Sequence, residues 1–455
     1  MARTSVCGRL RPRARSLCAS VRDFLTPALF KQVQQARPRR RGQSRWTPQP
    51  LLLVLLCLTW TCGDSQAERF ETAKSFVAVC LPKRRRPGKT VQGFHKALAR
   101  LPLAVLRLVA SYLRRRLAEV LRVGWLVNGF VPIGCDGSRL ECARTEELER
   151  RLGQAGKPGS APTVWLTALV HLRLGVPWAW RWGQGTASER DHLRHLLDLL
   201  PALALLVADA GYVGYDLIRT LLERRVSFLI RMSRQATFYR EGGGTLEHFH
   251  EGIVYYWPPR KKKGRPQQAP LRVRLLRVRC RRYKKDVWLA TNVLDRKQLS
   301  LAQAAQFYRM RWEHEGFFRT YQRTLAKVKL QSRTVRLVHR EAEGSLRATQ
   351  LLLAQGALAL QPRAARSQPA TAAVACSPRQ VLLAIRDELR AARPRRCHFG
   401  KRLAEARREQ RARRSAKEKR PWPRRTPHKP PKAPQLLTLG PEEKARILQH
   451  ETLIE

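Results

Sequence analysis

A stretch of the sequence near residue 310 places one carboxylate among arginines. Ser300 stands where a helix N-cap is expected and good helix formers follow it, so we expect one long helix through residue 323. Tyr308, Arg311 and Glu315 are spaced three and four residues apart and therefore share one face of this helix. Arg319 continues that face, so Glu315 has an arginine one turn before it and one turn after it. An ordinary helix with intrahelical ion pairs would show the same pattern, so the rest of the chain has to decide.

Two aspartates follow apolar runs that are typical of strands. Residues 121–133 are largely apolar and predict a buried strand that delivers Asp136 at its end. Residues 202–208 form a near-continuous apolar run, typical of a central strand covered on both faces, and Asp209 follows directly. Residues 163–182 predict two more meander strands, and a capped helix follows them at residues 188–200. In such a mixed sheet, we expect the two aspartates to lie side by side.

A cluster of Asp136, Asp209 and Glu315 would have a definite chemical use. Clustered carboxylates without counter-charge are unfavourable unless they hold divalent cations. Two such ions about 3.5–4 Å apart activate a nucleophile and stabilise the leaving oxygen in phosphodiester chemistry. Each aspartate alone is weak evidence, because an aspartate at a strand end is most often a turn residue. The ordered set of three is the stronger signal.

The composition points to a polyanionic partner. The chain has 455 residues, with 90 Lys and Arg against 34 Asp and Glu, and a formal net charge of +56. Nucleic acid is the first candidate for such a charge and an anionic membrane surface is the second. A membrane protein would need a spanning segment, and the apolar run at residues 51–60 is too short for one. This run resembles the core of a signal peptide, but a buried helix is the favoured interpretation.

The ten cysteines are scattered and show no metal-binding spacing. We therefore expect them to be small core residues in a reducing compartment.

The amino-acid composition and the pattern of apolar residues change several times along the chain, and these changes predict four regions. Residues 233–286 within the third region predict a β-rich insertion that contacts DNA. Its basic run contains Lys261, Lys262 and Lys263, and its residues 271–279 alternate so that the arginines are expected on one exposed face. The four regions are a basic arm at residues 1–45, a helical domain at 46–120 with a possible role in binding DNA ends, an α/β catalytic domain at 121–362, and a flexible Pro/Ala/Arg-rich basic tail at 363–455.

Taken with these residues, the chain resembles the bacterial insertion-sequence transposases with a ribonuclease-H-like DDE core. It resembles most the branch with a Tyr-(2)-Arg-(3)-Glu-(6)-Lys signature. The resemblance covers roughly residues 120–362 and departs from the signature at Gln322, where the family has lysine. The matching residues are Tyr308, Arg311 and Glu315, the two aspartate segments 134–138 and 208–212, and the closing segment 329–335.

This resemblance implies an activity and a fold. The fold would be α/β, a ribonuclease-H-like mixed-sheet core with a β-rich insertion, preceded by helices and followed by the basic tail. Asp136, Asp209 and Glu315 would hold two Mg²⁺ ions, for which Mn²⁺ is able to substitute. Water would nick the DNA at the element end, and the freed 3′-hydroxyl would attack further phosphodiesters, through a hairpin on the flanking end in this branch. The DNA-bound form would be a homodimer in the bacterial cytoplasm, associated with the nucleoid.

The resemblance also assigns contacts to double-stranded DNA, both element ends and target. Arg311 and Arg319 would bind phosphates beside the cut, and Tyr308 would hydrogen-bond a phosphate or pack the helix. Because position 322 carries glutamine, Arg319 and Arg323 are expected to supply the charge of the missing lysine.

Two alternatives remain open at the level of sequence. A non-catalytic or decayed DNA-binding protein on the same fold predicts the loss of a carboxylate, and all three are present. A structure-selective nuclease on the same fold is disfavoured by the Tyr-Arg-Glu helix, and its products would distinguish it.

Overall fold

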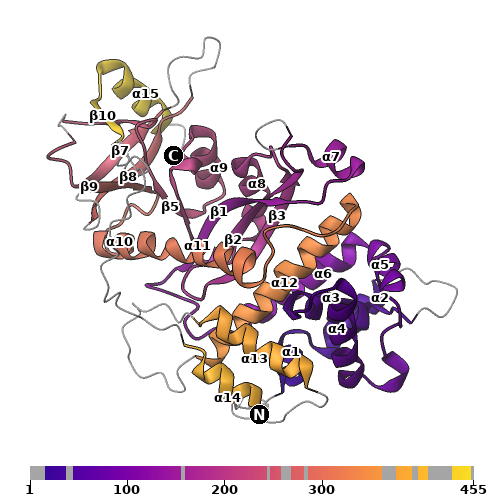
Figure 1. The fold of residues 1–455 in the computed structure, drawn as a ribbon. Helices are drawn as coiled ribbons and strands as arrows, with labels where there is room; N and C mark the ends of the chain where they lie inside the picture. The colour runs from indigo at the N-terminus through magenta and orange to yellow at the C-terminus, as the bar shows by residue number, and fades with distance from the viewer. Residues whose placement is uncertain are drawn as a thin grey trace, which may run out of the picture.

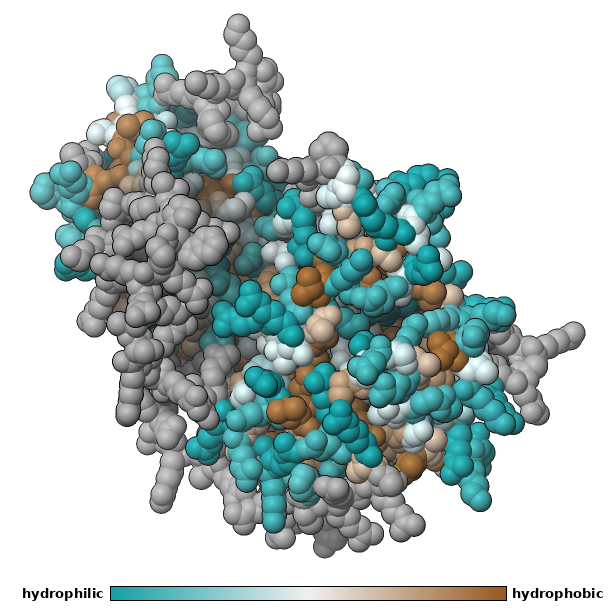
Figure 2. All heavy atoms as spheres, in the orientation of Figure 1, coloured by the Kyte–Doolittle hydropathy of each residue, from teal (hydrophilic) through white to brown (hydrophobic). Residues whose placement is uncertain are grey.

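One large mixed sheet crosses the molecule, with helices on both of its faces (Figure 1). Hydrophilic side chains cover most of the face seen in Figure 2, and hydrophobic ones show between them in small patches. The computed structural model describes residues 16–36, 45–154, 159–242, 246–257, 268–280, 285–360, 376–391, 398–407 and 433–451.

The strand order of the sheet is β10-β6-β7-β8-β9-β5-β4-β1-β2-β3. The strands β1, β2 and β3 form the expected antiparallel meander, and β4 and β5 run parallel to β1. Strand β9 pairs antiparallel with β5, so the predicted insertion continues this sheet. The strands are β1 (Val131–Glu141), β2 (Thr163–His171), β3 (Val176–Gln184), β4 (Ala204–Ala208), β5 (Ser227–Arg231), β6 (Thr237–Arg240), β7 (Glu251–Tyr256), β8 (Leu271–Cys280), β9 (Lys285–Thr291) and β10 (Gln435–Thr438).

Strand β4 is buried along its whole length because both faces of the sheet are covered. Its side chains alternate between two apolar clusters, as the period of two requires. Leu206 and Ala208 belong to the larger cluster, which includes residues of α8 (Glu189–Leu196) and α9 (Tyr215–Glu223). Leu205 and Val207 belong to the smaller cluster, which includes residues of α10 (Leu301–Met310). The side of β4 that faces α10 is the side on which the site is built.

The N-terminal region is helical and packs into the larger apolar cluster. Helix α3 is buried over most of its surface, as expected for residues 51–60, and no helix among the described residues is long and apolar enough to span a membrane. The basic arm expected at residues 1–45 is folded where the structure describes it, because α1 and α2 bury Phe24, Leu29 and Val33. The elements are α1 (Leu17–Phe24), α2 (Pro27–Gln35), α3 (Pro48–Trp60), α4 (Gln66–Cys80), η1 (Lys83–Arg85), α5 (Val91–Ala99) and α6 (Leu103–Val120).

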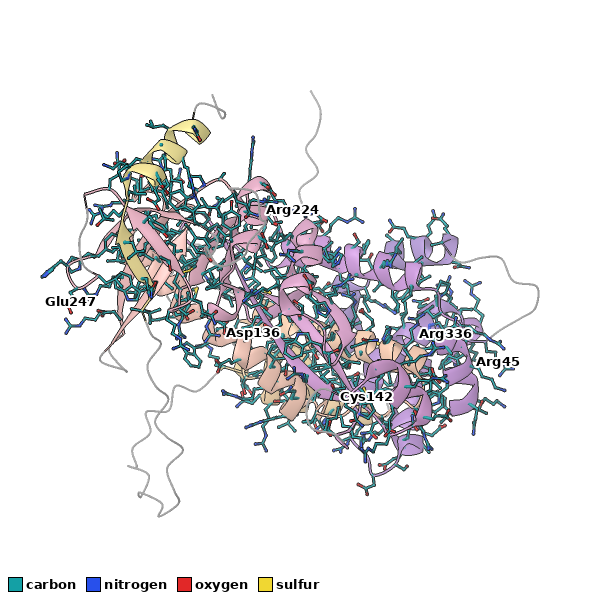
Figure 3. The ribbon with its side chains drawn as sticks, turned by 90° about the horizontal axis from the view of Figure 1, so that it is seen from above. Arg45, Asp136, Cys142, Arg224, Glu247 and Arg336 are labelled. Carbon is teal, nitrogen blue, oxygen red and sulfur yellow. A yellow bond between two sulfur atoms is a disulfide. The ribbon has the colours of Figure 1, made fainter. Side chains whose placement is uncertain are left out.

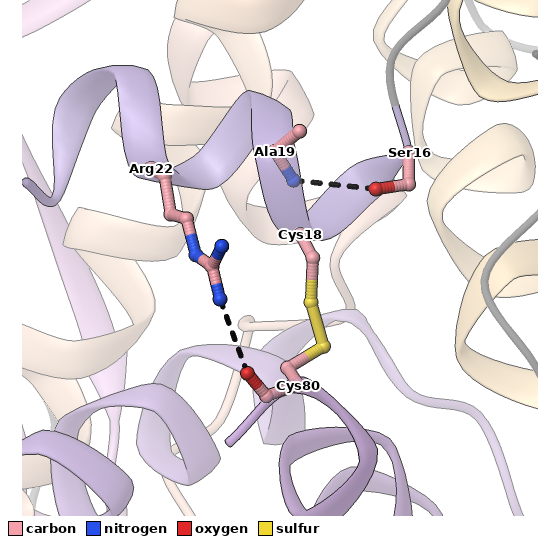
Figure 4. Close-up of a disulfide and its surroundings, with 5 residues drawn as sticks. All are labelled: Ser16, Cys18, Ala19, Arg22 and Cys80. Atoms are coloured by element: carbon pink, nitrogen blue, oxygen red, sulfur yellow. Dashed lines mark hydrogen bonds between the residues drawn. A yellow bond between two sulfur atoms is a disulfide. The ribbon is translucent and has the colours of Figure 1, made fainter. Parts of the chain in front are cut away.

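A disulfide joins Cys18 in α1 to Cys80 at the end of α4 (Figure 4). Arg22 adds a hydrogen bond to the Cys80 carbonyl, with Nη2 and the oxygen 3.2 Å apart. The prediction that the cysteines are reduced core residues is therefore wrong for this pair. It holds for most of the other cysteines of the described ranges, since Cys57, Cys135, Cys142 and Cys376 are buried and Cys62 is half-buried. The two partners lie 62 residues apart in sequence, a separation that carries no spacing signal.

The C-terminal region is folded where the structure describes it, which corrects the prediction of a flexible tail. Helices α13 (Pro378–Arg390) and α14 (His398–Glu405) bury Ile385, Phe399 and other apolar side chains in the larger cluster. Strand β10 pairs in parallel with β6 and forms one edge of the sheet, and α15 (Pro441–Glu451) follows it. Helix α14 and strand β10, which follow each other along the chain, thus lie at opposite ends of the molecule (Figure 1).

The stretch expected to be one long helix is divided into three pieces. Ser300 caps α10 through a capping box with Gln303, as its position predicted. At Arg311 the backbone tightens, since Arg311 N bonds to Tyr308 O and His314 N bonds to Arg311 O. The chain continues as α11 (Trp312–Arg319), the π-helical turn η4 (Thr320–Thr324) and the long helix α12 (Val335–Ala359). The remaining short elements are α7 (Glu146–Leu152), η2 (Leu197–Leu199) and η3 (Ala210–Tyr212).

Strand β8 does not carry all its arginines on one exposed face. The consecutive Leu275 and Leu276 shift the alternation by one residue, so Arg272 and Arg274 lie on one face and Arg277 lies on the other. Arg274 is buried and ion-paired to Glu251, with Nε and Oε1 2.8 Å apart. The three lysines 261–263 lie outside the described residues, so their DNA contact stays a prediction.

Gly344 in α12 tests how the N-terminal helices are attached to the rest of the protein. A Cβ at this position would overlap the side chain of Leu55 in α3, whose Cδ1 atom would be 2.7 Å away. Gly344→Ala should therefore destabilise the protein by about 1–3 kcal/mol, although helix propensity alone would stabilise it by about 1 kcal/mol. Urea unfolding of this variant, alone and combined with Leu55→Ala, measures the effect. The penalty should shrink in the Leu55→Ala background, and a stabilising Gly344→Ala would contradict the close packing of α3 on α12.

Candidate active site

The parallel pairing of β1 with β4 brings two aspartates level. The register pairs Ile133 with Leu206 and Gly134 with Val207, and the same offset two residues further on aligns Asp136 with Asp209. By the period of two, Asp136 shares a face with Gly134 and Asp209 shares one with Val207, and this is the face toward α10 and α11. The two carboxylates are therefore neighbours, as the sequence predicted.

Asp136 lies inside β1 rather than at the end of a strand over residues 121–133. Asn128 and Gly129 have positive φ angles of 46° and 81°, and Val127 and Phe130 pair with each other across this turn. The strand therefore begins only at Val131. The apolar run 121–130 forms a turn that packs against the sheet, which an apolar count alone does not distinguish from a strand.

The charges around Asp136 are poorly balanced. The pKa of the Asp136 carboxyl is raised to about 6, because burial and the charge of Asp209 raise it by more than the Gly137 backbone N–H and Arg311 lower it. The Gly137 nitrogen lies 2.9 Å from Asp136 Oδ1. Asp209 caps η3 by accepting a hydrogen bond from the Gly211 N–H at 2.8 Å. Both aspartates are thus held by backbone donors at fixed positions.

Glu189, the first residue of α8, is a third carboxylate at this place, and the sequence reasoning missed it. Burial, together with the charges of Asp136 and Asp209, raises its pKa to about 7. It approaches from the other face of β1, where a Cβ on Gly137 would be 2.5 Å from Glu189 Oε1 and 2.8 Å from Trp165 Nε1, so a larger residue there would displace both side chains. The buried Tyr212 hydrogen-bonds it. The available signal was the Ser188 cap, which places an acidic residue at the start of a helix beside this sheet.

The tightened turn at Arg311 brings the signature residues to the same face. Arg311 Nη1 lies 3.9 Å from Asp136 Oδ2, and Arg311 Nη2 lies 3.5 Å from Glu315 Oε1. Arg231 hydrogen-bonds the hydroxyl of Tyr308, and burial raises the pKa of this tyrosine. Tyr308, Arg311 and Glu315 therefore lie beside the aspartates, with the arginine between Glu315 and Asp136. Figure 3 shows Asp136 well inside the molecule, between the insertion that carries Glu247 and the helical region that carries Arg45.

His314 fixes α11 on the sheet directly beneath this group. Its side chain is fully buried, and its Nε2 atom lies 2.9 Å from the Ala168 carbonyl oxygen of β2. A Cβ on Gly134 would be 3.2 Å from its Cδ2 atom, so the absence of a side chain there admits the ring. Burial lowers the pKa of His314 to about 4, so the ring is neutral at pH 7 and donates from Nε2 to the carbonyl. The packing sets the height of Glu315 above the strands.

Gln322 holds the other end of this segment. Its Nε2 atom donates to Ser138 Oγ at 2.9 Å, which ties η4 to β1 two residues beyond Asp136. Arg319 and Arg323 are exposed, and neither forms an ion pair with a carboxylate of the described residues. At the position of the family's lysine this chain therefore has a neutral side chain with a structural bond.

The donor set suits a hard divalent cation, although it is not assembled as a complete metal centre. Within the described ranges, no three His, Cys, Asp or Glu side chains are grouped so that they could hold a metal ion. Asp136 and Asp209 nevertheless offer only carboxylate oxygens, the ligands that Mg²⁺ and Mn²⁺ prefer, and a bound cation would stabilise the charged form of Asp136, which burial and the charge of Asp209 disfavour. The two aspartates therefore suit a divalent cation. Glu315 is instead ion-paired with Arg311.

One family model matches the part of the chain that carries this site. Residues 135–351 match the family model described as "Transposase DDE domain", a span just under half of the chain that contains Asp136, Asp209 and Glu315. The match supports a transposase of the DDE superfamily. No curated protein matches the chain. A solved structure titled "Cryo-EM structure of piggyBac transposase synaptic complex with hairpin DNA" is similar over 89% of this chain and 84% of that chain, with a TM-score of 0.42 and 9% identity.

The raised carboxyl pKa values predict a pH-dependent loss of stability. Burial and mutual repulsion raise the pKa of Asp136 from 3.8 to about 6 and that of Glu189 from 4.5 to about 7. The contribution of these two protonated carboxyls to the free energy of unfolding is present at pH values below their unfolded-state pKa values. It is lost as pH rises through their folded-state pKa values of about 6 and 7. We therefore compare the melting temperature of the wild type in EDTA with that of an Asp136→Asn, Glu189→Gln double variant. The difference, wild type minus variant, should fall between pH 5 and pH 8.

Asp191→Asn is the matched control for this experiment, because Asp191 is an exposed acid on the same helix α8. This variant should follow the wild type across the pH range. A constant difference between the wild type and the double variant would contradict the assignment of an anionic cluster.

Proposed function

We propose that this chain is a DDE transposase that cuts DNA at the ends of a mobile element and joins those ends to target DNA. The observation that carries the proposal is the alignment of Asp136 with Asp209 on the paired strands β1 and β4, with Glu315 on the helix that covers them. The family match over residues 135–351 supports it.

The proposed catalytic core consists of β1 to β5, and its order supports a ribonuclease-H-like assignment. The antiparallel meander β1-β2-β3 is joined through β1 to the parallel strands β4 and β5. The carboxylates of Asp136, Asp209 and Glu315 are the proposed ligands for two Mg²⁺ ions, with Mn²⁺ as a substitute. Such ions, when bound, lower the pKa of a bound water and stabilise the oxygen that leaves phosphorus.

The chain's own residues have three tasks in this proposal. The backbone donors of Gly137 and Gly211 orient the two aspartates before DNA arrives. His314 keeps α11 seated so that Glu315 faces the strands. Arg311, Tyr308 and Arg319 bind phosphates beside the scissile bond, and Arg323 adds charge in place of the family's lysine. Guanidinium groups suit this task because their planar fork matches two phosphate oxygens.

The partner in this proposal is double-stranded DNA, and the net charge of +56 supports strong attraction to it. The proposed assembly on DNA is a homodimer, and the proposed setting is the bacterial cytoplasm and its nucleoid. The proposed role of residues 46–120 in binding element ends has to be tested with point variants. Deleting them would expose the partners of the buried helix α3, including α12, so loss of end binding would have no clear cause.

Cleavage of DNA that carries both native element ends tests this function. The purified full-length protein with Mg²⁺ should break both boundaries and insert the ends into a second DNA. Asp136→Asn, Asp209→Asn and Glu315→Gln should each reduce cleavage to background while DNA binding, measured by gel shift, persists. Asp191→Asn should cleave as the wild type does.

The two alternatives give different products in the same assay. A non-catalytic DNA-binding protein would shift the DNA without cleaving it, in wild type and variants alike. A structure-selective nuclease would cleave without joining ends to target. Either result would overturn the transposase assignment.

A further inference from the structure

The guanidinium of Arg311 lies between two carboxylates that come from different elements. Asp136 belongs to β1, and Glu315 follows one turn later on α11. The two arginine nitrogens lie 3.9 Å from Asp136 Oδ2 and 3.5 Å from Glu315 Oε1. The Arg311 side chain is only 11% exposed, so most of its surface is withdrawn from water. It is the cation that separates the proposed ligand Glu315 from the two aspartates.

These contacts are loose for a buried arginine. A charge-assisted hydrogen bond between nitrogen and carboxylate is about 2.7–2.9 Å long, and both Arg311 distances are longer. Arg311 Nε is buried without a hydrogen-bond partner among the residues that the structure describes. The rings of Tyr308 and Trp312 lie 5.9 and 5.2 Å from the guanidinium carbon and offer it their π faces, while Arg231 hydrogen-bonds the hydroxyl of Tyr308. The Arg311 guanidinium therefore has N–H donors that would form better hydrogen bonds with a phosphate than with the carboxylates beside it.

The backbone around Arg311 allows a second position of this side chain. The residue stands at the junction of α10 and α11, where two successive bonds span three residues rather than four. Tightened turns inside helices often mark hinges. Trp312, the next residue, is 50% exposed, so the surface beside the junction is accessible to a large ligand.

We propose that Arg311 and divalent cations compete for the carboxylates of Asp136 and Glu315, and that a DNA phosphate releases both carboxylates by drawing the guanidinium away. The inference rests on the proposed function, since it concerns the same site. A positive charge beside a carboxylate disfavours a second cation there. The complete metal centre would then form only when DNA is bound, so that the protein carrying no DNA is held inactive by its own arginine.

The proposal predicts that removing Arg311 strengthens metal binding in the absence of DNA. Calorimetric titration with MnCl₂ of the full-length, DNA-free protein measures this directly. Arg311→Gln should bind Mn²⁺ about tenfold more tightly than the wild type, the effect of about 1.4 kcal/mol less competition. The same variant should cleave DNA less well, because its phosphate contact is lost. A residue that only binds phosphate would leave the Mn²⁺ affinity without DNA unchanged.

Two variants control for charge and for folding. Arg309→Gln removes one positive charge from the neighbouring helix α10 at an exposed position, and its Mn²⁺ affinity should stay within about twofold of the wild type. Arg311→Lys keeps the charge at the site, and it should bind Mn²⁺ close to the wild-type level. Circular dichroism and melting temperature show whether each variant is folded.

The outcomes separate this inference from the function on which it rests. Asp136→Asn should weaken Mn²⁺ binding in both the wild-type and the Arg311→Gln background. If it does so while Arg311→Gln fails to tighten binding, the competition is disproved and the metal site stands. Equal tightening by Arg311→Lys and Arg311→Gln would also disprove it, because the charge would then not be the cause. If Asp136→Asn has no effect, the proposed metal site itself fails.

Discussion

The parallel pairing of β1 with β4 is the constraint on which the site depends. A fixed register between two neighbouring strands makes Asp136 and Asp209 neighbours although 72 residues separate them in the sequence. A slip of one residue would turn one aspartate to the opposite face, among the apolar side chains of the larger cluster. Burial on both faces of β4 therefore stabilises the same register that brings two negative charges together, and the core opposes their repulsion.

Everything that covers these aspartates is matched to that register. Gly134 makes room for His314, and Gly137 makes room for Glu189, on opposite faces of one strand. Gln322 bonds to Ser138 on the same strand and fixes the far end of the helical segment. The buried helix α3 packs against α12, so the N-terminal helices, the sheet and the signature segment form one continuous packed body. The positions of the charged groups in the site consequently depend on apolar packing throughout this body.

The sequence predicts those features that rest on local patterns, and it fails where distant contacts decide. The strand β4, the capped helices after Ser188 and Ser300, and the neighbouring aspartates follow from apolar runs and cap residues. The start of β1 at Val131 was missed because the turn before it is as apolar as a strand. The helices α1 and α13 were missed because the basic composition of the surrounding regions outweighed the apolar residues within each helix. The disulfide and Glu189 were missed because tertiary packing brings their partners together. The interruption at Arg311 carries no proline or glycine signal.

Anomalous X-ray diffraction from crystals of the full-length protein with Mn²⁺ and DNA carrying an element end is the most direct test of the central claim. The account predicts a manganese peak coordinated by the carboxylates of both Asp136 and Asp209, with Glu315 completing the site and Arg311 on a phosphate. A manganese peak elsewhere, or bound DNA with no peak between these two aspartates, would contradict it.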